Sequence, residues 1–291
     1  PTFCRFFSQT RGECMKHSDD RFTGSGGRSI YFQCWEPEIA PAAVLLLAHG
    51  AGEHSTRYQH LAQYFTGHNY AVGALDHNGH GYSEGFPGHV DSFEDYLHDV
   101  AIFHRKLAAR FPGVPMFFLG HSMGGLIACN YLLNYQSDFV GAVLSGAAIK
   151  TDLEPGRLQM ALLRLCAWLL PRLGILRLNA AGVSRDPEVV RNYAQDPLVF
   201  HGKMSARMCR ELFAGMHLVQ TEAARISLPV LILHGGADVM TSPEGSRFLD
   251  QHISSSDKTL KIYPGLFHEI FNEPERIAVL EDVLHWCESK I

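Results

Sequence analysis

The stretch Met116–Tyr135 limits the folds available to this chain more than any other segment. Residues 116–119 are all apolar and predict a buried strand, and residues 126–135 follow a helix pattern. Between them lies Gly-His-Ser-Met-Gly-Gly, a G-x-S-x-G motif in a strand–turn–helix context. We expect a strained backbone at Ser122, with Gly120 and Gly124 allowing strand and helix to approach closely. This turn predicts a nucleophilic hydroxyl at a helix N-terminus, and the alternative is a glycine-rich turn without chemistry.

Strands alternate with helices along most of the sequence. Apolar runs predict buried strands at 44–48, 70–75, 116–119, 140–145, 229–234 and 259–263, and residues 21–36 predict two strands joined by a glycine-rich tip. Helices are expected at 55–65, 92–110, 126–135 and 275–289, the second opened by a capping box. This order predicts an α/β fold whose mainly parallel sheet carries helices on both faces. The loops after the strands then meet at one edge, where such sheets bind ligands.

Length and composition suggest one domain with an insertion. At 291 residues the chain can bury one large core, and residues 21–291 are predicted to form a single domain, with residues 1–20 as an extension outside the fold. The interval 149–227 shows no clear strand and predicts a helical cap. Residues 158–178 within it are almost continuously apolar, although Arg164, Pro171 and Arg172 oppose a transmembrane helix. Two compatible interpretations remain: a buried helix pair, and a lid whose apolar face borders an acyl pocket or rests on a lipid surface.

Charge and cysteine usage narrow the class of protein. A net charge of −5 without a Lys/Arg run argues against nucleic-acid binding. The seven cysteines are scattered without a C-x-x-C pair, and the start of the chain lacks the apolar run of a signal peptide, so a reducing, cytoplasmic setting is expected. No metal site is expected, because the histidines that would suggest one lie in predicted turns rather than on one helix face. They are His49, His54, His77, His80 and His89.

A serine nucleophile needs a base, and the base needs an acid that orients it. His268 lies in the loop after the last predicted strand, and Asp238 lies in the loop after the strand before it. Both loops reach the edge of the sheet toward which Ser122 points, and the order serine, aspartate, histidine is that of the α/β-hydrolases. Asp76 and Glu244 are the rival acids.

The same chemistry needs hydrogen-bond donors for the tetrahedral oxyanion. The N–H of Met123, directly after the nucleophile, is one expected donor. The second is expected in the loop after residues 44–48, where Ala51 lies within His-Gly-Ala-Gly. This chemistry requires no cofactor.

Several longer segments make the comparison more specific, because they resemble the monoacylglycerol lipases (monoglyceride lipases), a family of the α/β-hydrolase fold. The resemblance runs from about residue 28 onward and rests on HGAGEHSTRY, DHNGHGYSEG, GHSMGG, NYAQDPLV, HGGAD and DKTLKIYPGLFHE. It implies a triad of Ser122, Asp238 and His268 and an oxyanion hole made by the amides of Ala51 and Met123. It also implies a cap that shapes an acyl tunnel and contacts the membrane.

The resemblance further implies that Glu53, Arg57 and Tyr193 line the glycerol end of the site. From the residues alone, Glu53 and Arg57 fit an exposed i,i+4 ion pair equally well, and Tyr193 fits a packing aromatic. Two positions depart from the family. Thr241 replaces the reactive cysteine of mammalian members, so thiol-directed inhibition is not expected there, and Phe271 replaces a histidine that helps to bind glycerol.

Together these features predict a serine hydrolase that cleaves a single-chain lipid ester, a monoacylglycerol, into fatty acid and glycerol, with peripheral membrane contact through the cap. A lysophospholipase or general carboxylesterase with the same triad is the alternative enzyme. A non-catalytic binding protein of the hydrolase fold is the alternative from another class. The preferred acyl length, and whether two copies form a homodimer, stay open.

Overall fold

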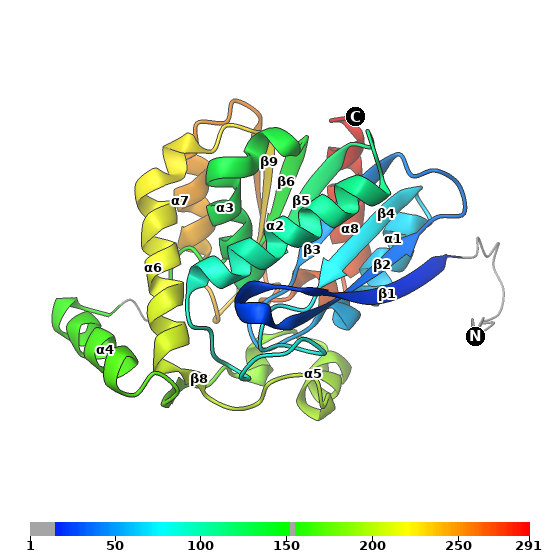
Figure 1. Cartoon of the computed structure of the whole chain (residues 1–291). Coiled ribbons are helices and arrows are strands. Elements are labelled where there is room, and N and C mark those ends of the chain that lie inside the picture. Colours follow the sequence, from blue (N-terminus) through cyan, green and yellow to red (C-terminus); the bar gives the residue numbers. More distant parts are fainter. Residues whose placement is uncertain (1–14, 152–154) are drawn as a thin grey trace.

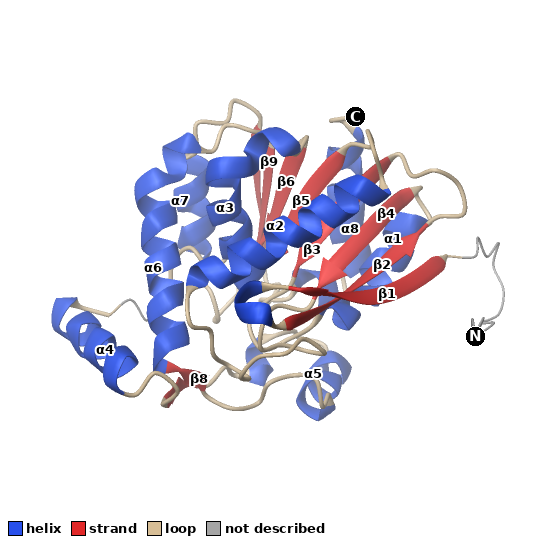
Figure 2. Ribbon diagram, viewed as in Figure 1, coloured by secondary structure: helices blue, strands red, loops and turns tan. Residues whose placement is uncertain are grey.

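The computed structural model describes residues 15–151 and 155–291, and an eight-stranded sheet forms its centre (Figures 1 and 2). The strands lie in the order β1-β2-β4-β3-β5-β6-β9-β10. Pairs β1–β2 and β2–β4 are antiparallel, and the remaining neighbours are parallel, which confirms the predicted mainly parallel sheet. The bounds are Lys16–Thr23 (β1), Ser29–Glu36 (β2), Ala43–Ala48 (β3), Tyr70–Leu75 (β4), Met116–His121 (β5), Gly141–Ser145 (β6), Val230–Gly235 (β9) and Lys258–Tyr263 (β10).

Helices cover both faces of this sheet (Figure 1). On β3, Val44 and Leu46 pack in the core cluster that includes α2, α3, α6 and α7, whereas Leu45 and Leu47 pack in the cluster that includes α1 and α8. Because successive side chains of a strand point to opposite faces, a continuous apolar run is what burial on both faces requires. The bounds are Gln59–Thr66 (α1), Phe93–Arg110 (α2), Met123–Tyr135 (α3), Ala206–Glu222 (α6), Pro243–His252 (α7) and Arg276–Glu288 (α8).

The sheet begins earlier than the sequence predicted. Strand β1 pairs with β2 along its whole length, from Lys16 opposite Glu36 to Thr23 opposite Ser29. The expected extension 1–20 is therefore wrong for residues 16–20, which belong to the sheet, while residues 1–14 lie outside the described ranges. The polar sequence of β1 is typical of an edge strand, and an apolar pattern does not reveal such a strand.

Two predicted helix starts had different outcomes. Ser92 caps α2 in the expected capping box, in which its side chain accepts from the N–H of Glu94. Ser55 does not cap α1, because a short 3₁₀ turn, Ser55–Tyr58, precedes that helix. Its hydroxyl instead donates to Oδ1 of Asp76 at 2.6 Å, which ties the turn to the end of β4.

The insertion between β6 and β9 contains a small second sheet. Strands β7 (Gly174–Leu176) and β8 (Met204–Ser205) pair antiparallel, so the expectation of no strand in this interval is wrong. Helix α5 (Pro187–Gln195) lies between them in the chain. Helix α6 also falls within the expected cap interval 149–227, yet it packs on α3 and adds Met208 and Cys209 to the core (Figure 1). The part that stands off the sheet therefore ends before α6.

Helix α4 (Arg157–Leu169) packs on α6 along one side only (Figure 1). Ala167 is its one fully buried residue, whereas Leu158 is 75% and Trp168 is 72% exposed. The interpretation of residues 158–178 as a buried helix pair is wrong, because no second helix covers this face within the described ranges. Among the helices of those ranges, none combines the length and the apolar character needed to cross a membrane.

Candidate active site

The predicted nucleophile occupies a strained turn between β5 and α3. Ser122 has φ 54° and ψ −117°, and Asn69 is the only other non-glycine residue with a positive φ in the described part of the chain. A β-carbon on Gly120 would lie 2.5 Å from the carbonyl oxygen of Gly124, and one on Gly124 would lie 2.0 Å from that of Ala48. The strained turn is therefore confirmed, and it needs glycine at both positions.

Asp238 and His268 meet beside this turn. Nδ1 of His268 lies 2.6 Å from Oδ2 of Asp238, and both side chains are buried. The N–H groups of Met240 and Thr241 donate to Oδ1 of the same carboxylate at 2.7 and 3.1 Å. Because an ionised carboxylate only accepts, the proton of the 2.6 Å bond belongs to Nδ1. A neutral imidazole in this state keeps Nε2 as a proton acceptor, which is what a general base requires.

Burial and opposite charge act against each other in this pair. Burial alone would raise the pKa of the Asp238 carboxyl, but the charge of His268 and its hydrogen bond hold that pKa well below the usual value. Burial also disfavours a charged imidazole, yet the Asp238 carboxylate outweighs it and raises the pKa of His268 above 6.5. Asp238 therefore stays ionised at neutral pH and stabilises an imidazolium at His268.

Two further side chains hold the Asp238 carboxylate, and neither was predicted from the sequence to take part in the hydrogen bonding of the site. Nε2 of His234 lies 3.1 Å from Oδ2 of Asp238, and its Nδ1 lies 2.7 Å from the hydroxyl of Ser246. The hydroxyl of Thr241 lies 2.9 Å from Oδ2 of Asp238 and 3.2 Å from Nδ1 of His268. The available signal for His234 was its position on β9, four residues before Asp238.

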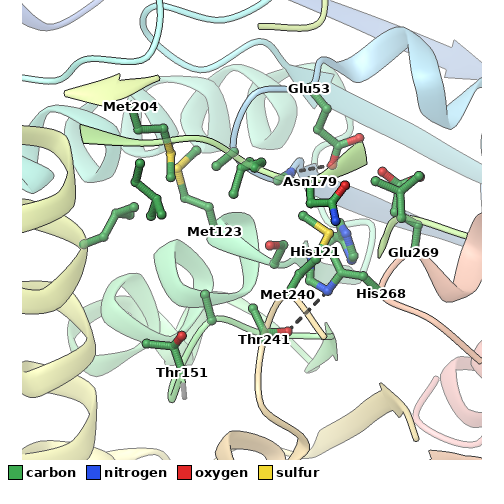
Figure 3. Close-up of a pocket in the computed structure, with 18 of the residues that line it drawn as sticks. Glu53, His121, Met123, Thr151, Asn179, Met204, Met240, Thr241, His268 and Glu269 are labelled. Atoms are coloured by element: carbon green, nitrogen blue, oxygen red, sulfur yellow. Dashed lines mark hydrogen bonds between the residues drawn. The ribbon is translucent and has the colours of Figure 1, made fainter. Parts of the chain in front are cut away.

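A cavity of about 440 Å³ brings the predicted nucleophile, base and oxyanion donors together (Figure 3). Ser122 and His268 both line it, and so do Ala51 and Met123. Met123 is the first residue of α3, so its N–H has no acceptor within that helix. A hydroxyl, an imidazole and two main-chain segments suited to hold an oxyanion therefore border the same space.

Much of the cavity wall is apolar. It is formed by the cap and by α6, which contribute Leu176, Leu178, Val183, Leu212, Phe213 and Met216. Cys209 also lines the cavity, and burial raises the pKa of its thiol to about 11. At this pKa the thiol stays protonated at neutral pH, so Cys209 lines the cavity without acting as a second nucleophile.

Glu53, Arg57 and Tyr193 do lie together, and the charged group of Arg57 pairs with those of Glu53 and Glu269. Arg57 donates to Glu53 at 2.7 Å and makes two hydrogen bonds to Glu269 at 2.6 and 2.7 Å. Its guanidinium carbon lies 4.7 Å from the centroid of the Tyr193 ring. The side chains of Arg57, Glu53 and Glu269 are 10%, 3% and 5% exposed. The expected i,i+4 pair of Glu53 and Arg57 exists, but the interpretation of it as an exposed pair is wrong. Glu269, which also pairs with Arg57, was not predicted.

This network joins two loops of the site. Oε1 of Glu53 accepts from the N–H of Gly50 at 2.6 Å, directly before Ala51. Burial opposes ionisation of Glu269, but the charge of Arg57 lowers the pKa of Glu269 to about 2. Through one guanidinium, the loop after β3 is held to the loop after β10, which carries the predicted base.

The two rival acids lie elsewhere. Asp76 is buried and accepts from the N–H groups of Ser55 and Tyr82 at 2.7 and 2.8 Å. Glu244 is exposed and pairs with Arg247 at 3.0 Å. Neither acid is among the described residues that line the cavity.

The histidines after β3 and β4 pack against each other. The ring of His49 lies 4.3 Å from that of His77 and 5.3 Å from that of His80, between centroids, and burial lowers the pKa of all three. Within residues 15–151 and 155–291, no group of three or more His, Cys, Asp or Glu side chains is placed to hold a metal ion. Phe271 packs in the core that includes α8.

Comparison with known proteins identifies the family. Residues 39–275 match the family model described as serine aminopeptidase, S33. A monoacylglycerol lipase of Mycolicibacterium smegmatis is 39% identical over 94% of this chain and 98% of its own length. The monoglyceride lipase of Rattus norvegicus is 32% identical over 91% of this chain and 88% of its own.

Solved structures agree with these relatives. The crystal structure of Paleococcus ferrophilus monoacylglycerol lipase matches with a TM-score of 0.79 at 31% identity, and the match covers 95% of this chain and 100% of that one. The resemblance predicted from the sequence is confirmed. The chain belongs to the serine aminopeptidase S33 family of the α/β-hydrolase fold, and its relationship to the monoacylglycerol lipases makes it a carboxylic ester hydrolase.

Proposed function

We propose that this hydrolase cleaves monoacylglycerols, with Ser122 as the nucleophile, His268 as the general base and Asp238 as the acid that orients it. One observation carries the proposal: the 2.6 Å hydrogen bond between His268 and Asp238 lies at a cavity that Ser122 also lines. The names of the relatives support the substrate class.

The reaction proceeds in two steps. Nε2 of His268 takes the proton of the Ser122 hydroxyl as its oxygen attacks the ester carbonyl, and the N–H groups of Ala51 and Met123 stabilise the oxyanion. The imidazolium then gives its proton to the departing glycerol oxygen, which leaves an acyl-enzyme. Water enters, and its oxygen attacks the acyl carbonyl as His268 takes its proton. The second tetrahedral intermediate then breaks down to fatty acid, and the imidazolium returns the proton to the departing Ser122 oxygen.

The lining of the cavity supports a substrate with one acyl chain and a small polar end. The acyl chain lies along the apolar wall formed by the cap and α6, while Glu53 and Tyr193, which both line the cavity, contact glycerol. Arg57 is not among the described lining residues. It acts on the glycerol end by holding Glu53 in place.

Replacement of the nucleophile tests the mechanism. Ser122→Ala is expected to reduce kcat on the order of a million-fold, as loss of a triad nucleophile does. Ser137→Ala, at an exposed serine outside the site, is the matched control. Activity of Ser122→Ala within about tenfold of wild type would contradict the scheme. Covalent labelling of Ser122 by a fluorophosphonate probe would dismiss the non-catalytic alternative.

A substrate panel tests the specificity. Monooleoylglycerol is expected to be hydrolysed with a higher kcat/KM than lysophosphatidylcholine or a short nitrophenyl ester. A preference for lysophosphatidylcholine would instead support the lysophospholipase, and equal rates on the short ester would support a general carboxylesterase.

We also propose that the chain works in the cytoplasm and contacts lipid surfaces through α4. Leu162, Leu165 and Trp168 leave 57%, 51% and 72% of their surface exposed on this helix, and exposed apolar side chains on one helix face are typical of interfacial binding. Leu162→Ser with Trp168→Ser is expected to abolish co-flotation with phosphatidylcholine vesicles, whereas Ile277→Ser, an exposed apolar residue on α8, is not. If the same face instead joins two copies, sedimentation will show a dimer that this double variant dissociates.

A further inference from the structure

A second cavity, of about 650 Å³, lies between α4 and α6 outside the proposed catalytic centre. Arg157 and Arg164 from α4 and Arg210 from α6 line it, together with His217. Its apolar residues include Phe213, which also lines the catalytic cavity. The two cavities therefore share part of a wall. The proposed reaction uses none of the arginines of the second cavity, nor His217.

The cationic side chains of this second cavity have few counter-ions. None of its described lining residues is an Asp or Glu. Arg210 pairs with Glu211, whereas no described carboxylate pairs with Arg157 or Arg164. Burial, followed by the charges of Arg207 and Arg164, lowers the pKa of Arg210, as expected where like charges gather. In a chain of net charge −5, this basic cavity favours an anion.

The sequence of the cap extends this charge. Between residues 155 and 185 the chain contains five arginines and no Asp, Glu or Lys. Of these arginines, Arg185 pairs with Glu273 and Glu275, and the stretch is flanked by Asp152, Glu154 and Asp186. The two α4 arginines, together with Met160, follow i, i+3, i+7 spacing and share one side of the helix. The exposed leucines Leu158, Leu162 and Leu165 repeat along another side. Apolar side chains that enter a membrane, flanked by arginines at the depth of the head groups, are the arrangement of an interfacial helix.

We propose that the cavity between α4 and α6 binds the phosphate group of an anionic phospholipid when α4 lies on a membrane. This inference rests on the lipid-surface contact proposed above and adds a head-group site to it. Arginine suits this ligand, because its planar guanidinium donates two parallel hydrogen bonds to phosphate oxygens. A head group bound there places the wall shared by the two cavities at the lipid surface. The catalytic cavity then lies next to the membrane that supplies the substrate.

Vesicle flotation with the full chain tests the site. Wild type is expected to bind vesicles of phosphatidylcholine with phosphatidylglycerol more tightly than vesicles of phosphatidylcholine alone. The double variant Arg157→Gln with Arg164→Gln is expected to reduce that preference roughly 25-fold. Each arginine near an anionic membrane surface contributes about five-fold in affinity, and the variant removes two of them. Binding to pure phosphatidylcholine vesicles, which carry no net surface charge, is expected to stay within about two-fold. Hydrolysis of a soluble nitrophenyl ester is also expected to stay within about two-fold, because neither arginine lines the catalytic cavity.

The matched control removes the same charge elsewhere on the cap. Arg191→Gln with Lys203→Gln alters two exposed cations that do not line the cavity. Equal losses in the two double variants would overturn the site in favour of diffuse attraction. Displacement of wild type by inorganic phosphate, but not by chloride at the same ionic strength, would show a free-phosphate site and overturn the lipid assignment.

The two proposals fail in different ways. Absence of wild-type binding to both kinds of vesicle would overturn the lipid-surface contact, and the head-group site with it. Binding to both kinds of vesicle with equal affinity would overturn the head-group site alone, and hydrolysis of monooleoylglycerol in detergent would test the catalytic assignment independently of either.

Discussion

Replacement of Arg57 by methionine should show how strongly the buried ion network stabilises the fold. The variant keeps a long side chain but leaves the carboxylates of Glu53 and Glu269 without their shared cation, at 3% and 5% exposure. Removal of one partner from a buried pair costs about 3–5 kcal/mol, because the remaining charge stays desolvated. For 291 residues, the unfolding entropy of about 2.1 cal/mol/K per residue gives about 0.6 kcal/mol/K, so Tm should fall by about 5–8 °C.

The pH dependence gives this prediction a sign. Burial already raises the pKa of Glu53 in wild type, and loss of Arg57 should raise it further. The same loss should raise the folded-state pKa of Glu269 above the unfolded value of about 4.3. The folded state then binds more protons than the unfolded state, so stability falls as pH rises. In wild type the pKa of Glu269 is lowered to about 2, and its ion pair is fully formed above about pH 4.5. The deficit of Arg57→Met relative to wild type should therefore grow between pH 5 and pH 8.

Urea denaturation of four proteins measures this coupling: wild type, Arg57→Met, Glu269→Gln and the double variant. The double variant should be less destabilised than the sum of the single variants by at least about 1 kcal/mol, because it buries one charge fewer. Additive losses, or a loss below about 1 kcal/mol in Arg57→Met at pH 8, would refute the reasoning.

Three further predictions concern the catalytic site. The acid limb of the kcat/KM profile should have its midpoint above pH 6.5, since the base must be neutral and Asp238 raises the pKa of His268; a midpoint below 6 would contradict this assignment. Thr241→Val should lower kcat/KM about 2- to 12-fold with KM nearly unchanged, because it removes one hydrogen bond to Asp238. An unchanged kcat and an unchanged pH profile would contradict a role of this hydrogen bond in the reaction. Gly124→Ala should prevent accumulation of folded protein, because its β-carbon would lie 2.0 Å from the carbonyl oxygen of Ala48; circular dichroism and activity like those of wild type would count against the close approach.

Much of the catalytic geometry could be predicted from the sequence, because it depends on local pattern and chain order. The apolar runs of β3 and β5 identify strands buried on two faces, and parallel strands bring the loops that follow them to one edge. Ser122, Asp238 and His268 follow the parallel strands β5, β9 and β10, so their convergence can be predicted without knowledge of side-chain contacts.

Other features depend on which elements cover one another, and local pattern carries no information on that. Glu269 meets Arg57 across 212 residues of chain, and nothing in either segment indicates the other. The polar strand β1 is held by main-chain hydrogen bonds to β2, which side-chain periodicity does not report.

The cap shows the same division. The sequence by itself determined that residues 158–178 are apolar and interrupted by arginines, and this composition suits a buried helix and a lipid-facing helix equally. Only the tertiary structure excluded the fully buried helix: α6 covers one side of α4, and no described element covers the side that carries Trp168. The physical reason is that an apolar surface is buried only when a second surface covers it. A sequence pattern describes the first surface and not the second.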